Sequence, residues 1–226
     1  MEEIDYLREF YIEDLSKIVT YGKNPRPRVA NPGKWAKLNS VVNLNESAIT
    51  LEGRKVWAWS DLHFHHKNII RFSERPYDDL EQMHEHLLAN HNEYVGKDDV
   101  VIWGGDIGFG GTGVINEMLA EYNGYKILIV GNHDFNGKKL RKLNFDETHL
   151  IYTVDYPAVS MVFTHYPMHN VPEPWINVHG HLHLFPDPVS SHPRHLNINC
   201  EVQGYRPRAL DEIAKQAELM GISAKL

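Results

Sequence analysis

The chain contains a single cysteine, Cys200, among its 226 residues, so no intrachain disulfide can form. Low cysteine content is typical of proteins in a reducing compartment, and we therefore expect a cytoplasmic location. The sequence also lacks any apolar run close to the about 20 residues that a membrane-spanning helix needs. Its acidic start lacks the basic and apolar regions of a signal peptide. We expect no membrane association.

Positive charge is also scarce. The chain has 23 Lys and Arg against 30 Asp and Glu, which gives a formal net charge of -7. A protein that tracks an extended nucleic acid uses a positive channel, so nucleic acid is disfavoured as a partner but not excluded. Hydrophobic residues make up 42% and charged residues 23%, as in ordinary globular proteins. The length suits one domain with an appendage.

The first 54 residues differ from the rest. Apolar residues at helical spacing predict an amphipathic helix over residues 3–19. Residues 21–32 are rich in proline and basic side chains, which predicts a loop. This loop either contacts a phosphate-bearing substrate or is simply solvated. We predict an N-terminal extension, helix plus proline-rich loop, over residues 1–54 and one further domain over residues 55–226.

Beyond residue 55, the pattern predicts strands that alternate with helices and then strands joined by short loops. The predicted helices cover residues 79–95, 113–123 and 208–220, and the later strands cover 151–156, 159–164, 175–179 and 195–200. His84 and His86 are expected on the solvated face of the first of these helices. The βαβ rhythm indicates a parallel sheet covered by helices. We therefore predict a two-sheet α/β sandwich with an N-terminal helical extension.

Five predicted strands end on Asp, Asn or His at the same offset from an apolar run. Sites in open α/β sheets lie outside the carboxyl ends of the strands, so these side chains point to one shared site. The seven candidate ligands are Asp61, His63, Asp106, Asn132, His165, His181 and His183.

All seven candidates offer nitrogen or oxygen, which suits Mn, Fe, Zn or Ni better than a metal that selects thiolates. Seven ligands exceed what one tetrahedral ion needs, whereas two ions bridged by a carboxylate would use them all. Alternatively, Asp61 and Asp106 are individually ordinary strand-end residues or helix N-caps. Glycines precede several candidates, as tight turns around a metal require.

Five segments carry a resemblance to a known family. They are Asp61-Leu-His63, Gly105-Asp106, Gly131-Asn-His-Asp134, Thr164-His165 and Gly180-His-Leu-His183. Together and in this order they resemble the calcineurin-like metallophosphoesterases, over roughly residues 55–205. The stretch after Ser60, with Arg75-Pro76 behind it, is similar to a bacterial and phage-type branch. That branch commonly has glycine at the position of His65.

The resemblance implies two divalent metal ions, manganese first, with Fe, Zn or Ni as alternatives. One ion would be held by Asp61, His63, Asp106 and His183. The other would be held by Asp106, Asn132, His165 and His181. Hydroxide between the ions would attack phosphorus in line. His133 would protonate the leaving group, oriented by Asp134. The alternative for His133 is a surface imidazole without a role.

Three more residues could contact substrate: His66, Arg75 and His195. Arg75 suits a structural ion pair equally well. We predict a phosphoesterase acting on phosphate esters, with a preference for phosphodiesters of small or cyclic nucleotides. Phosphomonoesterase and nuclease activity stay open as alternatives. A non-catalytic scaffold of the same fold is a further alternative, although the complete ligand set and His133 argue against it.

Overall fold

The computed structural model describes residues 19–20, 28–29, 51–134, 140–157, 159–171, 173–184 and 193–221. The predicted N-terminal helix lies outside these residues, except that Val19 belongs to a strand. Strand β1 (Val19–Thr20) pairs antiparallel with β2 (Arg28–Val29), which interrupts the predicted loop. Among the described residues, no helix combines the length and apolarity needed to cross a membrane.

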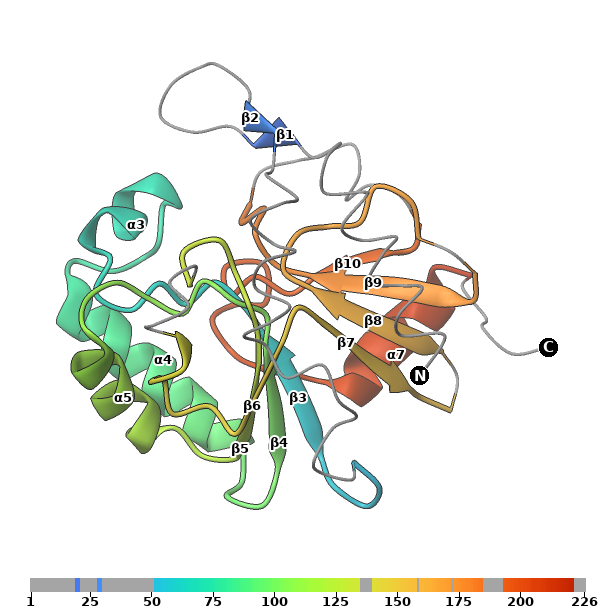
Figure 1. The fold of residues 1–226 in the computed structure, drawn as a ribbon, viewed down its shortest axis with the longest axis horizontal. Helices are drawn as coiled ribbons and strands as arrows, with labels where there is room; N and C mark the ends of the chain where they lie inside the picture. The colour runs from blue at the N-terminus through green and yellow to red at the C-terminus, as the bar shows by residue number, and fades with distance from the viewer. Residues whose placement is uncertain are drawn as a thin grey trace.

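The first sheet has five strands in the order β11-β3-β4-β5-β6. Its strands are β3 (Val56–Trp59), β4 (Val100–Trp103), β5 (Tyr125–Ile129), β6 (Glu147–His149) and β11 (Arg208–Ala209). All pair in parallel except β11, which runs antiparallel to β3. Figure 1 shows α4 (Leu80–Tyr94) and α5 (Thr112–Glu121) beside this sheet, and α3 (Lys67–Phe72) higher in the view, away from the strands.

Strand β3 shows why the predicted strands read as unbroken apolar runs. Its Trp57 and Trp59 belong to a core shared with Met83 of α4, whereas Val56 and Ala58 belong to a second core. A parallel strand that is covered on both faces needs apolar residues at every position. The two cores therefore fix β3 in the middle of the molecule.

The second sheet has four strands in the order β10-β9-β8-β7. Its strands are β7 (Ile151–Asp155), β8 (Ser160–Thr164), β9 (Trp175–His179) and β10 (His195–Asn197), and helix α7 (Leu210–Leu219) follows β11. Phe163, Ile176 and Val178 of this sheet pack in the same core as Val56 and Ala58. The predicted two-sheet α/β sandwich is therefore confirmed.

Helix α4 matches its prediction closely. The Asp79 side chain caps it by accepting a 2.9 Å hydrogen bond from the backbone N–H of Gln82. Met83, Leu87 and His91 form its buried face, as the periodicity predicts. The helix thus begins and ends within one residue of the predicted bounds.

His84 differs from the prediction. It is half-buried, and its Nε2 accepts a 3.1 Å hydrogen bond from the backbone N–H of His65. Burial, with the nearby His65, lowers the pKa of His84 to about 4. The His84 ring lies 4.7 Å from that of His65 and 5.8 Å from that of Phe64. His86 is exposed, as expected.

The carboxyl ends of β3 and β4 carry their following loops side by side. The backbone N–H of Asp61 donates to Gly105 O at 3.0 Å, and that of His63 donates to Asp106 O at 3.1 Å. An isolated bridge between Ser60 and Asn199 joins this edge to the segment after β10. The strand ends of both sheets therefore meet in one place.

Candidate metal centre

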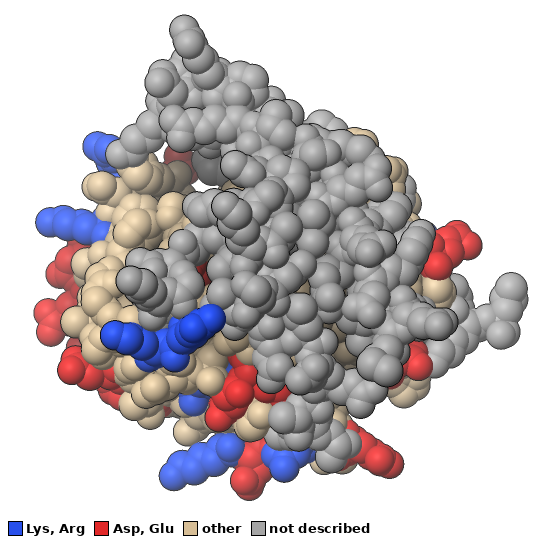
Figure 2. Space-filling model, in the orientation of Figure 1, with Lys and Arg blue, Asp and Glu red and all other residues tan. Residues whose placement is uncertain are grey.

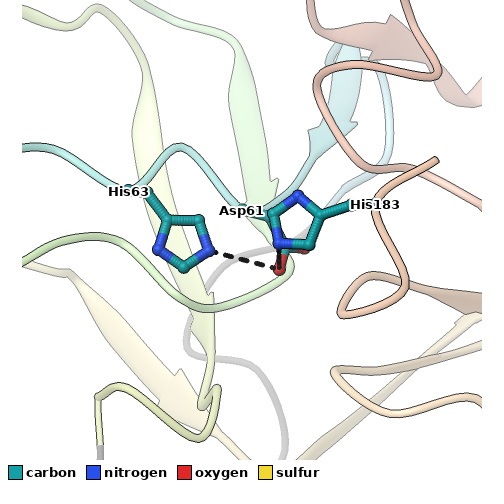
Figure 3. A group of neighbouring side chains, drawn as sticks. All are labelled: Asp61, His63 and His183. Atoms are coloured by element: carbon teal, nitrogen blue, oxygen red, sulfur yellow. Dashed lines mark ion pairs between the residues drawn. The ribbon is translucent and has the colours of Figure 1, made fainter. Parts of the chain in front are cut away.

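The structure brings the candidate ligands into two neighbouring groups. The first metal group consists of Asp61, His63 and His183. Each member offers a ligand atom within 4.8 Å of the others. His63 Nε2 lies 3.9 Å and His183 Nε2 lies 3.8 Å from Asp61 Oδ1. Figure 3 shows both imidazoles turned toward this carboxylate, an arrangement that can hold one cation.

The second metal group consists of Asp106, His165 and His181, again within 4.8 Å of one another. His165 Nε2 lies 3.5 Å from Asp106 Oδ1. The same nitrogen is 2.9 Å from Asn132 Oδ1, which adds Asn132 to the group. Asp106 Oδ2 is 3.8 Å from His63 Nε2, so the Asp106 carboxylate reaches both groups.

Several atoms of the first group fit a metal ion because they are otherwise unsatisfied. Asp61 Oδ1 and both ring nitrogens of His63 are buried and have no hydrogen-bond partner among the described residues. A buried polar atom without a partner costs about 1–3 kcal/mol. A divalent cation between these atoms would supply the missing interaction.

Burial also sets the charge of the groups. It raises the pKa of Asp61 to about 6 and that of Asp106 to about 7. It lowers the pKa of His63, His165 and His181 below the ordinary value. Metal ligands must be neutral imidazoles and ionised carboxylates. These three imidazoles are thus ready to bind, and a bound cation would stabilise the carboxylate charges. The pKa of His183 is raised instead, because its hydrogen bond to Glu201 and the charges of Asp61 and Glu201 outweigh burial.

The backbone is strained at the same residues. Eight non-glycine residues of the described chain have positive φ, and five of them belong to the two metal groups. These five are Asp61, His63, Asp106, His181 and His183, with φ between 50° and 70°. A left-handed conformation costs about 1–3 kcal/mol at such a residue and is found mainly at functional sites.

Gly180 allows the first metal group to form. A Cβ at this position would overlap Ser60 Oγ and Asp61 Oδ2. We therefore expect Gly180→Ala to displace the Asp61 carboxylate, to weaken Mn²⁺ binding, and to lower the free energy of unfolding by about 1–3 kcal/mol. Isothermal titration with Mn²⁺ and denaturant unfolding measure the two effects.

Gly113→Ala is the matched control, because no atom lies within 4 Å of a Cβ there and the residue is in α5. This variant should bind Mn²⁺ normally and be as stable as the wild type or slightly more so. Wild-type Mn²⁺ affinity in Gly180→Ala would contradict the close contact with Asp61.

His133 lies beside the metal groups and faces outward. Its side chain is 42% exposed, and its Nε2 lies 3.8 Å from Asp106 Oδ2. Its backbone N–H donates to Asp106 Oδ1 at 2.8 Å, which fixes the turn that carries it. Burial lowers the pKa of His133, while the charge of Asp134 opposes this shift.

Asp134 has a different place from the one expected. Its Oδ2 accepts hydrogen bonds from the backbone N–H groups of Asp106 and Gly131 at 2.8 and 2.9 Å. Its Oδ1 accepts from Ile107 at 3.1 Å. Asp134 therefore holds the turns of Asp106 and Gly131 together, and its negative charge acts on His133 by opposing the fall of the His133 pKa.

Arg75 is buried, and the structure places it in an ion pair. Its Nη2 lies 2.7 Å from Glu201 Oε1. Of the two alternatives that the sequence leaves open, this geometry favours the structural one. Sequence reasoning missed Glu201: it directly follows the predicted strand 195–200 but belongs to none of the five motifs.

The other two substrate candidates lie in different surroundings. His66 is half-buried beside the metal groups, with its ring 4.2 Å from that of Phe109 and 6.5 Å from that of His133. His195 is buried in β10, where it pairs in register with Asn177 in the middle of β9, and its ring lies 5.6 Å from that of His179. Only His66 is thus brought to the described site.

A model of the calcineurin-like phosphoesterase family matches residues 54–217 of this chain. An uncharacterized protein of Methanocaldococcus jannaschii is 31% identical over 176 residues, which cover 73% of this chain and 92% of that protein. The gene 66 protein of Mycobacterium phage L5 is 40% identical over 81 residues, 34% of this chain and 39% of that protein.

A solved structure has the same fold. The crystal structure of a protein of unknown function from Aquifex aeolicus superposes with a TM-score of 0.58 at 23% identity. The match covers 72% of this chain and 99% of that one. At this identity the likeness concerns the fold alone.

Proposed function

The chain belongs to the calcineurin-like phosphoesterase family, and from this membership we propose a dinuclear site that hydrolyses phosphodiesters of small or cyclic nucleotides. The family makes the chain a metal-dependent hydrolase of phosphate esters. One observation carries the dinuclear proposal. The Asp106 carboxylate lies between the two groups, with Oδ2 3.8 Å from His63 Nε2 and Oδ1 3.5 Å from His165 Nε2.

We assign the first metal group, with Asp106, to one ion and the second metal group, with Asn132, to the other. Asp106 would be shared between them. The oxygen and nitrogen donors suit Mn²⁺ first, with Fe, Zn and Ni as alternatives. When bound, the two ions would supply positive charge for the phosphate and acidify the attacking water.

The protein's own groups have distinct parts in this proposal. The outward-facing His133 would donate a proton to the leaving oxygen, because its exposed ring can reach a substrate that rests against Asp106. Asp134 would hold the turns of Asp106 and Gly131, and so keep His133 in place. His66 would line the entrance next to His133.

The preference for small substrates rests on charge. The formal net charge is -7, and on the described part of the face in Figure 2 Lys and Arg side chains are interspersed with Asp and Glu. A long nucleic acid gains most of its affinity from a continuous positive surface.

We further propose that residues 1–54 form an extension outside the catalytic domain.

The test is turnover of the Mn²⁺-loaded protein on bis(4-nitrophenyl) phosphate, 4-nitrophenyl phosphate, a 2′,3′-cyclic nucleotide and single-stranded DNA. We expect the diester and the cyclic nucleotide to be hydrolysed faster than the monoester. Faster hydrolysis of the monoester or of DNA would contradict the proposed preference for small phosphodiesters. If the metal-bound protein hydrolysed none of these esters, the alternative of a non-catalytic scaffold would be supported.

A further inference from the structure

Arg75 and Glu201 make an ion pair that is buried beside the first metal group. Their exposed fractions are 4% and 8%. Arg75 Nε and Nη2 donate to Glu201 Oε1 at 2.9 and 2.7 Å. Removing two charges from water is costly, and a buried pair of this kind is by itself weak evidence for a stabilising role. Its position therefore calls for a specific explanation.

Arg75 holds the loop that carries the first ligands. Its Nη2 donates to the carbonyl oxygen of Asp61 at 2.6 Å, and its Nη1 donates to that of Leu62 at 2.8 Å. All three guanidinium nitrogens are thus engaged within the protein. A phosphate group would find none of them free, which separates Arg75 from the substrate.

Glu201 holds a ligand from the other sheet. Its Oε1 accepts a 2.9 Å hydrogen bond from His183 Nδ1. Because a carboxylate only accepts, Nδ1 carries the proton of this bond. In the neutral imidazole the lone pair then lies on Nε2, which is 3.8 Å from Asp61 Oδ1. This is the tautomer that a metal ligand needs, and a carboxylate behind the imidazole makes it more basic.

The chain path explains how Glu201 arrives there. After β10, the backbone N–H of Cys200 donates to Ser60 O at 3.0 Å, next to an isolated bridge between Ser60 and Asn199. This contact carries the following residue, Glu201, to the loop of Asp61. Glu201 therefore lies where it can touch both the β3 loop, through Arg75, and the β9 loop, through His183.

We propose that the Arg75–Glu201 pair positions the first metal group by fixing Asp61 and His183 relative to each other across the two sheets. This inference rests on the metal centre of the proposed function. In the second metal group, His165 Nδ1 pairs instead with the uncharged carbonyl oxygen of Gly104, at 2.8 Å. Loss of Glu201 should consequently affect one ion and spare the other.

The effect on each metal group can be measured separately in variants that keep only one of the two groups. His165→Ala disables the second group, and His63→Ala disables the first. In the His165→Ala background, Glu201→Gln should weaken Mn²⁺ binding, followed by electron paramagnetic resonance, by about 10- to 100-fold. In the His63→Ala background it should leave the affinity unchanged. Gln keeps the shape of Glu and one acceptor oxygen but lacks the negative charge. Circular dichroism of each variant confirms that the fold is retained before affinities are compared.

Glu147→Gln is the matched control, since Glu147 forms another buried pair, 2.8 Å from His149 Nε2. It should change the Mn²⁺ affinity in neither background. Arg75→Lys should also weaken Mn²⁺ binding by the first metal group, because a single ammonium cannot make the several directed hydrogen bonds of the guanidinium. An unchanged affinity of Glu201→Gln in the His165→Ala background, or an equal loss in both backgrounds, would overturn the proposal.

Failure of the proposed function gives a different result. In that case the wild-type protein itself would bind fewer than two ions or would hydrolyse none of the esters. The effect of Glu201→Gln is read as metal affinity, so it does not depend on turnover.

Discussion

Asp106→Asn is expected to lower turnover on the order of 10²-fold or more, beyond the loss typical of residues that only support a ligand. Asp106 is the carboxylate that reaches both groups, 3.8 Å from His63 Nε2 and 3.5 Å from His165 Nε2. An amide of the same shape keeps an acceptor for the backbone N–H of His133 but carries no charge. Affinity for both ions should therefore fall together.

The metal-free protein should respond in the opposite direction. Burial raises the pKa of Asp106 to about 7, so the folded state disfavours its ionised form near neutral pH relative to the unfolded state. Asparagine removes this cost. We expect the metal-free variant to melt at the wild-type temperature or above, while the rise in melting temperature on adding Mn²⁺ becomes smaller.

Asp99→Asn is a suitable control. The Asp99 carboxylate also has structural partners, Trp57 Nε1 and the backbone N–H of Gly96, but it belongs to neither metal group. It should bind Mn²⁺ as the wild type does. Wild-type turnover and Mn²⁺ content in Asp106→Asn would show that this carboxylate is not a shared ligand.

His133→Ala should lower turnover by about 10²–10⁴-fold on esters with a poor, alkoxide-like leaving group, as expected for a lost general acid. On a 4-nitrophenyl ester the loss should be much smaller, because nitrophenolate leaves with little need for a proton. Both metal groups should stay intact, because the His133 side chain is 42% exposed. The hydrogen bond from His133 to Asp106 comes from the backbone N–H, which the substitution keeps. Steady-state kinetics on the two esters measure the difference.

His133→Asn is the companion variant and should give the same pattern with normal Mn²⁺ content. An equal loss on both esters would indicate that His133 binds the phosphate or stabilises its charge instead. An unchanged rate on both would make His133 a surface imidazole without a catalytic part.

The sequence predicts the two-sheet fold well because its core strands carry continuous signals. Both faces of β3 and β4 are buried, so every residue there is apolar and the pattern is easy to recognise. Strand β6 was not predicted, because it consists of only Glu147, Thr148 and His149. Its polar side chains are stabilised by tertiary contacts, such as the pair between Glu147 and His149, that no local pattern contains.

The candidate site could be predicted only where a residue follows an apolar run. Asp61 and Asp106 satisfy that condition, and the structure brings them together. Glu201 follows the predicted strand 195–200, but its role could not be predicted, because it meets His183 only through a contact between the segment after β10 and Ser60, far away in sequence. The left-handed φ angles of the candidate ligands suit Asp and His, which adopt such angles more often than most other non-glycine residues, but residue type alone does not say which of them do.

The most direct test of the dinuclear centre is elemental analysis of the protein after saturation with Mn²⁺ and removal of free metal. We expect two ions per chain in the wild type, one for each metal group, and one ion in His63→Ala and in His165→Ala. One ion or none per wild-type chain would contradict the dinuclear centre.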